Sequence, residues 1–375
     1  MTKTRITTLV GTRPELIRMS SIIKRFDIAF EHRLVHTNQN SDPNLLDIFL
    51  RDLEIRKPDK NLGVIQSSLG EFLGDLMHKF ERELEENPPH GLVILGDTNS
   101  ALAGIIAKRR GIPIYHLEAG NRSFDSNVPE EINRKIVDHF ADFNLAYTDR
   151  ARENLLREGL IPRNIATIGS PLKEVLDTHI DSINKSEILT ELGIKSKNYF
   201  LVSAHRQENI DDHKRLLVLV DSINTIAEKF ELPVIVSLHP RSKNKIDLAK
   251  TSFHSLVRLH EPFGFLDYNK LQLEARVVLS DSGSVSEEAV ILGFPAVTIR
   301  DSMERPEALE SGCVLMSGII KEGILESISI IESGSPSQTP PQEYLISDTS
   351  TRVTNFISST IHQHSFWNGL RSSQS

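Results

Sequence analysis

The chain has 375 residues, of which 25% are charged and 39% are hydrophobic, and its formal net charge is -8. This length predicts two or three domains, and the acidic balance argues against a nucleic acid or an anionic membrane surface as partner. The single cysteine, Cys313, excludes an intrachain disulfide and a multi-cysteine metal cluster, and no apolar run approaches the roughly 18 residues of a membrane span.

Short apolar runs alternate with helical patterns along the chain. The first run, residues 6–10, is too short for the apolar region of a signal peptide, which favours a strand and a cytoplasmic protein. Buried strands are predicted at residues 6–10, 92–95, 112–116, 143–147, 165–168, 200–204, 234–238, 277–279 and 296–299. Helical spacing is found at residues 69–86, 130–141, 172–180, 214–230 and 351–361. Because apolar strands separated by helices form parallel sheets covered on both faces, the pattern predicts doubly wound α/β domains.

Two breaks divide this pattern. Gly-Ser-Pro at residues 169–171 follows a predicted strand and opens a helix, and a turn-rich loop at 333–342 precedes the final helix. Residues 1–169 are predicted to form an N-terminal Rossmann-like domain, and residues 170–350 a second Rossmann-like domain. Residues 351–375 are predicted to form a C-terminal helix that packs back on the first domain.

The end of the first strand carries a candidate anion-binding segment. Residues 11–15, Gly-Thr-Arg-Pro-Glu, open a helix, so Arg13 is placed to meet a phosphate or a carboxylate, and Arg18 lies about one turn further on. A capping turn with a solvated arginine explains the same residues equally well.

Three carboxylates follow at comparable places. Asp97 and Glu118 come directly after predicted strands, and Glu130 opens a predicted helix that also carries Arg134. Asp97 could be only a helix N-cap, and Glu130 could only complement a helix dipole. Because the carboxyl ends of parallel strands meet at one edge of a sheet, we expect the three carboxylates to face that edge.

The second half has two histidines and a run of small residues at strand ends. His205 and His239 follow successive strands; a lone histidine there is usually structural, but two favour a site. Small residues at a helix start expose backbone N–H groups that suit a pyrophosphate, although a simple N-cap is the alternative. The small residues are Ser282, Gly283 and Ser284. Glu288, on the first turns of that helix, could accept both hydroxyls of a ribose.

Several common motifs are missing from the sequence. It has no Gly-x-Gly-x-x-Gly after the first strand, no Walker lysine motif, no His-Glu-x-x-His and no Gly-x-Ser-x-Gly. We therefore expect proton transfer on a phosphorylated ligand, with no metal and no nicotinamide or other cofactor.

Together these segments resemble the non-hydrolysing UDP-N-acetylglucosamine 2-epimerase family. The resemblance covers nearly the whole chain, and its motifs are Gly-Thr-Arg-Pro-Glu at 11–15, Gly-Asp-Thr at 96–98, Glu-Ala-Gly at 118–120, Pro-Glu-Glu-x-x-Arg at 129–134, His-Arg at 205–206, Asp-Ser-Gly at 281–283 and Glu-Arg-Pro-Glu at 304–307. It implies a glycosyltransferase-B-type fold, with two Rossmann-like domains and the active site in the cleft between them. It also implies a homodimer that reversibly inverts C2 of a UDP-activated 2-acetamido sugar.

The resemblance further implies how the reaction proceeds. A proton beside an acetamido group is not acidic, so a carboxylate removes it from C2 while UDP leaves C1. The resulting 2-acetamidoglycal receives a proton on its other face, and UDP adds again. The implied acid–base residues are Asp97, Glu118, Glu130 and His205, the last acting on the departing phosphate; which carboxylate takes the proton stays open. The implied substrate- or UDP-binding residues are Arg13, Arg18, Arg134, His239, Tyr268, Ser282, Gly283, Ser284, Glu288 and Arg305.

The sequence also departs from the main pattern of the family. Ser284 replaces the second glycine after Asp-Ser, and the stretch 121–128 is shorter than usual. With residues 203–209, these features resemble the branch that makes UDP-N-acetyl-L-fucosamine from a 6-deoxy-L-talose precursor for bacterial surface polysaccharides. Two substrates stay open at this point: UDP-2-acetamido-2,6-dideoxy-L-talose and UDP-N-acetylglucosamine.

Three other functions compete with this interpretation. A glycosyltransferase of the same fold would need an acceptor pocket, and three acidic clusters favour proton transfer within one sugar instead. A hydrolysing 2-epimerase would share the glycal route and would release free sugar and UDP. A nucleotide-sugar sensor without activity would not need the full set of acidic residues.

Overall fold

The computed structural model describes residues 3–39, 43–65, 67–204, 206, 209, 211–238, 252–334 and 339–370, with the backbone alone at 43–46. The chain forms two compact units. Unit 1 comprises Met1–Asp177 and Glu343–Ser375, and unit 2 comprises Thr178–Gln342. The domain ranges expected from the sequence, 1–169, 170–350 and 351–375, stay a prediction about where the functional domains end.

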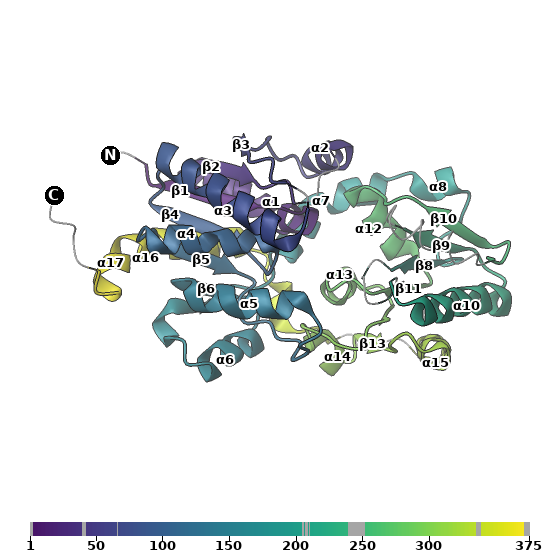
Figure 1. The fold of residues 1–375 in the computed structure, drawn as a ribbon. Coiled ribbons are helices and arrows are strands. Elements are labelled where there is room, and N and C mark those ends of the chain that lie inside the picture. The colour runs from purple at the N-terminus through teal and green to yellow at the C-terminus, as the bar shows by residue number, and fades with distance from the viewer. Residues whose placement is uncertain are drawn as a thin grey trace. The chain divides into compact units, whose positions relative to one another are not determined.

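Unit 1 is built on a seven-stranded sheet with the order β3-β2-β1-β4-β5-β6-β7, and every pair is parallel (Figure 1). Its strands are β1 (Arg5–Val10), β2 (Glu31–His36), β3 (Lys60–Asn61), β4 (Gly91–Leu95), β5 (Ile114–Leu117), β6 (Phe143–Ala146) and β7 (Ile165–Thr167). The strand order reverses between β1 and β4, where Leu9 lies opposite Ile94. Such a reversal opens a ligand site beyond the carboxyl ends of the strands.

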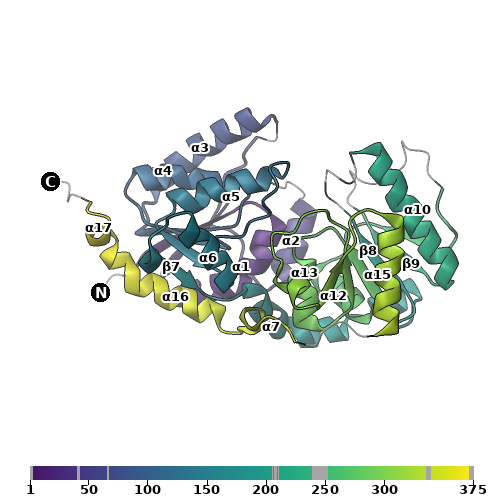
Figure 2. The ribbon, with the colours of Figure 1, turned by 90° about the horizontal axis from the view of Figure 1, so that it is seen from below.

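Helices cover both faces of this sheet. Its helices are α1 (Arg13–Ala29), α2 (Pro43–Asp52), α3 (Leu69–Glu86), α4 (Gly104–Arg109), α5 (Pro129–Phe140), α6 (Asp149–Arg157), the start of α7 (Pro171–Lys185), α16 (Thr349–Thr360) and α17 (His364–Trp367). Short 3₁₀ segments lie at η1 (Asn99–Ala103), η2 (Pro162–Asn164), η3 (Gln342–Leu345) and η4 (Ile361–Gln363). The side chains of α3, α4 and α5 form one core layer with β1 and β4, and Figure 2 shows these helices on one side of the sheet and α16 on the other.

The C-terminal helix α16 returns to unit 1, as predicted, and packs beside α1. The Tyr115 hydroxyl of β5 lies 3.0 Å from Thr360 Oγ1, and the Phe356 ring meets the Tyr115 ring edge-on with centroids 6.4 Å apart. The apolar spacing that predicted a final helix therefore gives it a buried face against the first sheet.

Unit 2 has a six-stranded parallel sheet with the order β10-β9-β8-β11-β12-β13. Its strands are β8 (Phe200–Ser203), β9 (Val234–Ser237), β10 (Val257–His260), β11 (Val277–Ser280), β12 (Ala296–Thr298) and β13 (Val314–Met316). The described helices are α8 (Ile188–Leu192), α10 (His213–Phe230), α12 (Phe265–Glu274), α13 (Val285–Leu292), α14 (Glu307–Glu310) and α15 (Lys321–Ser333), besides the end of α7. Side chains of α10 and α15 bury one face of the sheet, and its order reverses between β8 and β11.

Both parallel α/β sheets confirm the predicted fold class. The nine predicted strands are all present, with ends that differ by a residue or two, whereas β2, β3, β10 and β13 were not predicted. Among the described ranges, no helix is both long and apolar enough to cross a membrane.

Candidate active site

The loop after β1 packs so tightly that only glycine fits at position 11. A Cβ on Gly11 would lie 2.0 Å from Ser100 Oγ and 2.4 Å from Thr37 Oγ1, well inside contact distance. The residue that follows Thr12, Arg13, begins α1, and its guanidinium lies 5.6 Å from the centre of the Phe49 ring. The predicted anion-binding segment is thus held against the strand-order reversal of unit 1.

A buried carboxylate, Glu15, holds this loop in place. Its oxygens accept hydrogen bonds from Gly11 N at 2.9 Å, Thr12 N at 2.7 Å and Thr98 Oγ1 at 3.0 Å. Burial raises the pKa of Glu15 to about 7, although these hydrogen bonds act in the opposite direction. Since Thr98 follows Asp97 directly, Glu15 ties the loop after β1 to the loop after β4.

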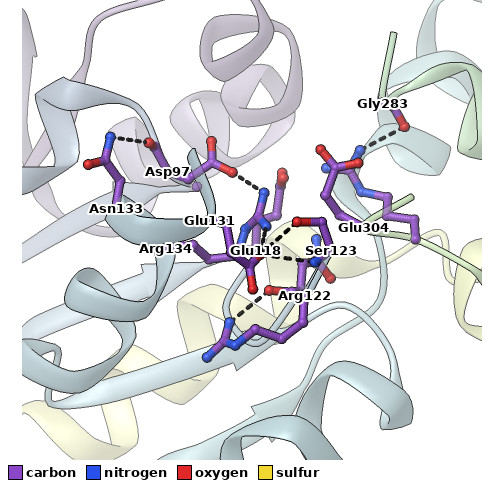
Figure 3. A network of polar contacts seen from close by, with 12 residues as sticks. Asp97, Glu118, Arg122, Ser123, Glu131, Asn133, Arg134, Gly283 and Glu304 are labelled. Atoms are coloured by element: carbon purple, nitrogen blue, oxygen red, sulfur yellow. Dashed lines mark hydrogen bonds and ion pairs between the residues drawn. The ribbon is translucent and has the colours of Figure 1, made fainter. Parts of the chain in front are cut away.

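Asp97 follows β4 and is fixed by α5. Its carboxylate pairs with the guanidinium of Arg134, which is 2% exposed, and its carbonyl accepts a hydrogen bond of 3.0 Å from Asn133 Nδ2 (Figure 3). Arg134 Nη1 also lies 3.0 Å from Glu131 Oε2. Arg134 therefore orients Asp97 from the helix; its predicted contact with substrate stays a prediction.

Glu118, after β5, has a backbone conformation that few residues other than glycine adopt. Its φ is 66°, and its N–H donates to the carbonyl of Leu145 in β6 at 3.1 Å. The carboxylate lies 3.5 Å from Arg18 Nε, and the Arg18 guanidinium stands 5.8 Å from the centre of the Tyr147 ring. Backbone strain of this kind gathers at functional sites, where the surrounding structure enforces it.

The Asp97 and Glu118 loops lie side by side. A Cβ on Gly96, the residue before Asp97, would lie 4.0 Å from Glu118 Cδ. Gly96 has a φ of 69° and donates its N–H to the carbonyl of Leu117 at 2.9 Å. Two predicted acid–base carboxylates therefore come from neighbouring strand ends beside the reversal point of the sheet.

The two glutamates that open α5 have different surroundings. Glu130 is exposed. Glu131 is 2% exposed and accepts hydrogen bonds from Ser123 N at 2.9 Å and Ser123 Oγ at 3.1 Å, besides its pairing with Arg134 (Figure 3). Glu131 therefore joins the loop after β5 to α5.

The start of α13 in unit 2 carries the predicted pyrophosphate-binding residues. Ser282 Oγ lies 2.9 Å from Ser284 Oγ, and both flank Gly283 at the end of β11, beside the second strand-order reversal. Arg305 Nη1 donates to the Gly283 carbonyl at 2.8 Å, and its Nε lies 2.8 Å from Glu287 Oε1. The arginine thus holds the backbone of the loop.

Three arginines surround the buried carboxylate of Glu304. Arg206 Nη2 lies 3.1 Å from Glu304 Oε1, Arg300 pairs with the other oxygen, and Arg305 is nearby. Burial acts to raise the pKa of Glu304, but the three guanidinium groups hold it well below its usual range. Arg300 is 4% exposed, and its Nε and Nη2 have no hydrogen-bond partner among the described residues. These N–H groups of Arg300 can donate to an anion.

Tyr268 and Glu288 are neighbours across α12 and α13. Burial, together with the charge of Glu288, raises the pKa of the Tyr268 hydroxyl. Gln272 Nε2 donates to Glu288 Oε2 at 2.6 Å, which fixes the carboxylate at the end of the sheet. His205 and His239, the remaining two predicted residues, lie outside the described residues.

Comparison with known proteins identifies the family. The sequence model of UDP-N-acetylglucosamine 2-epimerase matches residues 24–358. The chain belongs to this family. It is 36% identical to a UDP-N-acetylglucosamine 2-epimerase of Methanococcus maripaludis, over 85% of this chain and 89% of the relative. It is 32% identical to the UDP-2,3-diacetamido-2,3-dideoxy-D-glucuronate 2-epimerase of Pseudomonas aeruginosa, over 94% and 99% of the two chains.

A solved epimerase structure confirms the glycosyltransferase-B-type class of fold. The UDP-GlcNAc 2-epimerase of Methanocaldococcus jannaschii, in complex with UDP-GlcNAc and UDP, is 32% identical with a TM-score of 0.89, covering 95% of this chain and 100% of that one. As a member of this epimerase family, the protein is an isomerase.

Some residues of the candidate site were missing from the sequence prediction. Glu15 stands three residues after Thr12, and this Thr-x-x-Glu spacing is the signature of a capping box, which the structure contains. The arginine cluster around Glu304 had a weaker signal, because Arg206 and Arg305 belong to separate motifs and only Arg305 was predicted to bind the substrate or UDP. Nothing in the local sequence marks Glu131 rather than Glu130 as the buried member of its pair.

Proposed function

We propose that the protein is a non-hydrolysing UDP-N-acetylhexosamine 2-epimerase. The observation that carries the proposal is the pair of carboxylates, Asp97 and Glu118, at neighbouring strand ends of unit 1, in a chain related to such enzymes along nearly its full length. An epimerase that inverts C2 needs acid–base groups on two faces of the sugar, and Glu130, exposed at the start of α5, supplies a third candidate.

The reaction is an elimination followed by an addition. A carboxylate takes the proton from C2, the electrons of that bond form the C1–C2 double bond, and the C1–O bond breaks to release UDP. A second acid then gives a proton to the opposite face of C2, and a phosphate oxygen of UDP forms the C1–O bond again. No oxidant, metal or nicotinamide enters this balance. His205 is proposed to protonate or hydrogen-bond the departing phosphate oxygen.

Unit 2 is proposed to hold the nucleotide. Ser282, Gly283 and Ser284 would receive the pyrophosphate at the start of α13, with the positive charge of Arg300 and Arg305 close by. Preorganised donors of this kind stabilise the charge that develops on UDP, and each is typically worth about 3 to 4 kcal/mol of barrier.

The remaining proposed contacts bind the ribose, the uracil, the phosphates and the sugar. Glu288 is proposed to bind the ribose hydroxyls, Tyr268 to flank the uracil, and His239 to lie near UDP. In unit 1, Arg13 and Arg18 are proposed to meet the phosphate or the sugar. The Arg18 guanidinium is already engaged with Glu118, so its charge reaches the substrate beside that carboxylate.

The sugar is proposed to be one of three 2-acetamido sugars linked to UDP. Motifs favour UDP-2-acetamido-2,6-dideoxy-L-talose, which gives UDP-N-acetyl-L-fucosamine for surface polysaccharides. UDP-N-acetylglucosamine and UDP-2,3-diacetamido-2,3-dideoxy-D-glucuronate are the substrates named for the relatives. All three share the C2 acetamido group and the UDP leaving group on which the mechanism acts.

Incubation with each of the three sugars in D₂O, followed by NMR, tests the proposal. We expect one sugar to invert at C2 and to acquire solvent deuterium there. Release of free sugar and UDP would favour a hydrolysing 2-epimerase, and transfer to an acceptor would favour a glycosyltransferase. Absence of turnover with all three sugars, in the presence of bound UDP, would favour a nucleotide-sugar sensor and contradict the proposal.

We also propose a cytoplasmic homodimer. Both properties rest on the resemblance to the family. Sedimentation at micromolar concentration tests the dimer, and a monomer under those conditions would contradict it.

A further inference from the structure

A buried histidine, His116, connects the loop after β4 with helix α5. Its ring is fully buried in β5, with Nε2 2.8 Å from the Gly96 carbonyl and Nδ1 2.9 Å from Asp138 Oδ1. The Gly96 carbonyl belongs to the peptide unit that leads into Asp97. The imidazole therefore spans from the loop after β4 to α5.

Asp138 is the point where these contacts converge. Its carboxylate is fully buried and accepts hydrogen bonds of 3.3 and 3.2 Å from Gly120 N, two residues after Glu118. Arg122 Nη1 lies 2.7 Å from the second carboxylate oxygen. Burial acts to raise the pKa of Asp138, but His116 and Arg122 hold it below its usual range.

The contact of His116 with Gly96 has a defined direction. A carbonyl oxygen can only accept, so Nε2 carries a proton and donates it to Gly96 O. The other ring nitrogen, Nδ1, lies 2.9 Å from Asp138 Oδ1. Arg122 joins Asp138 to Glu158, since its Nη1 lies 2.7 Å from Asp138 Oδ2 and its Nε and Nη2 donate to the two oxygens of Glu158 at 2.8 and 2.6 Å.

We infer that His116 and Asp138 form a positioning pair that aligns the three proposed acid–base carboxylates. The pair holds the loop of Asp97 through Gly96 O and the loop of Glu118 through Gly120 N. It holds α5, whose first turn carries Glu130, through Asp138 itself. Neither residue of the pair touches the substrate; both act through the backbone of the loops. This inference rests on the proposed function, because the loops matter for the carboxylates that they present.

A second buried His–Asp pair in the same unit supplies a matched control. His364 Nε2 lies 2.9 Å from Asp142 Oδ1, and these side chains are 4% and 1% exposed. Asp142 also accepts from the N–H of Ile114 at 3.0 Å, at the beginning of β5, so this pair lies at the amino end of the strand rather than at the proposed site. The two pairs have the same chemistry and burial but contact opposite ends of β5.

The experiment compares Asp138→Asn and His116→Gln with Asp142→Asn and His364→Gln in the full chain. We expect the first two variants to lower kcat on the order of 10²-fold, because small displacements of reacting groups cost that much, with unchanged UDP affinity by calorimetry. The control variants should lose thermal stability and keep kcat. Unchanged kcat in folded Asp138→Asn and His116→Gln, or an equal loss in the controls, would overturn the inference.

NMR of the histidine rings tests the pair independently of turnover. In the wild-type protein we expect a slowly exchanging Nε2–H signal from His116, because this group donates to the buried Gly96 carbonyl; it is assigned by its loss in His116→Gln, or by selective labelling if that variant does not fold. A ring without a protected Nε2–H would overturn the inference even if every variant fails to fold. If the wild-type ring shows this signal but no sugar turns over, the proposed function fails while the pair itself stands.

Discussion

Buried carboxylates in this protein differ in the charge of their neighbours. Glu15 is surrounded by neutral N–H and O–H donors, and burial raises its pKa to about 7. Asp138 is equally buried but faces His116 and Arg122, so its pKa is held below the usual range. Desolvation dominates in the first case and neighbouring positive charge in the second. Glu15 is therefore a carboxyl group that titrates near neutral pH.

The raised pKa of Glu15 predicts a dependence of stability on pH. Between 4.5 and about 7 the folded protein binds a proton that the unfolded chain has lost, so the free energy of unfolding falls as pH rises through this window. The total loss is about 3 kcal/mol. Glu15→Gln should remove it while keeping the shape of the side chain. Chemical denaturation at several pH values between 5 and 8 measures this loss of stability. If the stability of Glu15→Gln falls with pH as steeply as that of the wild type, the raised pKa of Glu15 is contradicted.

Substitution of the two glutamates at the start of α5 should cause different defects, one in turnover and one in stability. Glu130→Gln, like Glu118→Gln, should lower turnover about 10² to 10⁴-fold and leave UDP affinity unchanged, because a proton-transfer group is lost and the nucleotide contacts remain. Glu131→Gln should instead lower the free energy of unfolding by about 1 to 3 kcal/mol, because its contacts with Ser123 and Arg134 are disturbed. Kinetics, UDP titration and denaturation of the three variants separate these outcomes. Near-normal turnover in both Glu118→Gln and Glu130→Gln would remove the acid–base site.

At the level of elements, the sequence predicted the inner strands other than β2, together with the edge strand β7. β4 and the first three residues of β11 are apolar and have little exposed surface, so they appear as continuous apolar runs. β2 begins with Glu-His-Arg and is partly exposed there, and β10 is half-exposed along its length. β3, β10 and β13 are edge strands, which need no continuous apolar run because one side lacks a neighbouring strand. The missed strands are therefore those for which burial leaves the weakest pattern.

The part of the candidate site that lies in sequence motifs could be predicted from the sequence. Asp97, Glu118 and the loop at Ser282 follow strands directly, and parallel topology alone brings such residues to one edge of a sheet. Asp138 lies in the last turns of α5, where its spacing is that of any helical residue. Its proposed role depends on a contact with His116, which lies in β5, and long-range packing of this kind leaves no signal in the local sequence.

Truncation of one buried side chain of α16 should destabilise unit 1 strongly. Ile357 is fully buried in the helix, so Ile357→Ala should lower the free energy of unfolding of unit 1 by about 2 to 5 kcal/mol. Ser358→Ala, on the exposed face of the same helix, is the matched control and should have little effect. Chemical denaturation of both variants makes the comparison, and equal stability of the two would contradict burial of this face.

At the scale of the whole molecule, each unit has its own sheet and its own apolar core. The proposed functions are divided in the same way, with acid–base residues in unit 1 and the nucleotide in unit 2. Binding stabilises whichever part of a protein holds the ligand. The change in stability of each unit when UDP is added therefore shows which unit binds the nucleotide.

UDP is predicted to stabilise unit 2 selectively. At a concentration 100 times its Kd, the nucleotide should add about 2.7 kcal/mol to the free energy of unfolding of the unit that binds it. Calorimetry of the Ile357→Ala protein, in which unit 1 is weakened, should resolve the two units, and UDP should raise the unfolding temperature of unit 2. Stabilisation confined to unit 1 would contradict the proposed division of roles.

The return of the chain to unit 1 has a consequence for the order in which the protein is made. Unit 2 is one unbroken stretch, Thr178–Gln342, whereas unit 1 needs both Met1–Asp177 and Glu343–Ser375. Domains generally fold as units during synthesis, starting from the N-terminal end. Here a ribosome completes unit 2 first, while the buried face that awaits α16 on unit 1 is still uncovered. The first-made half of the enzyme is thus the last to be finished, because its C-terminal segment is synthesised after the whole of unit 2.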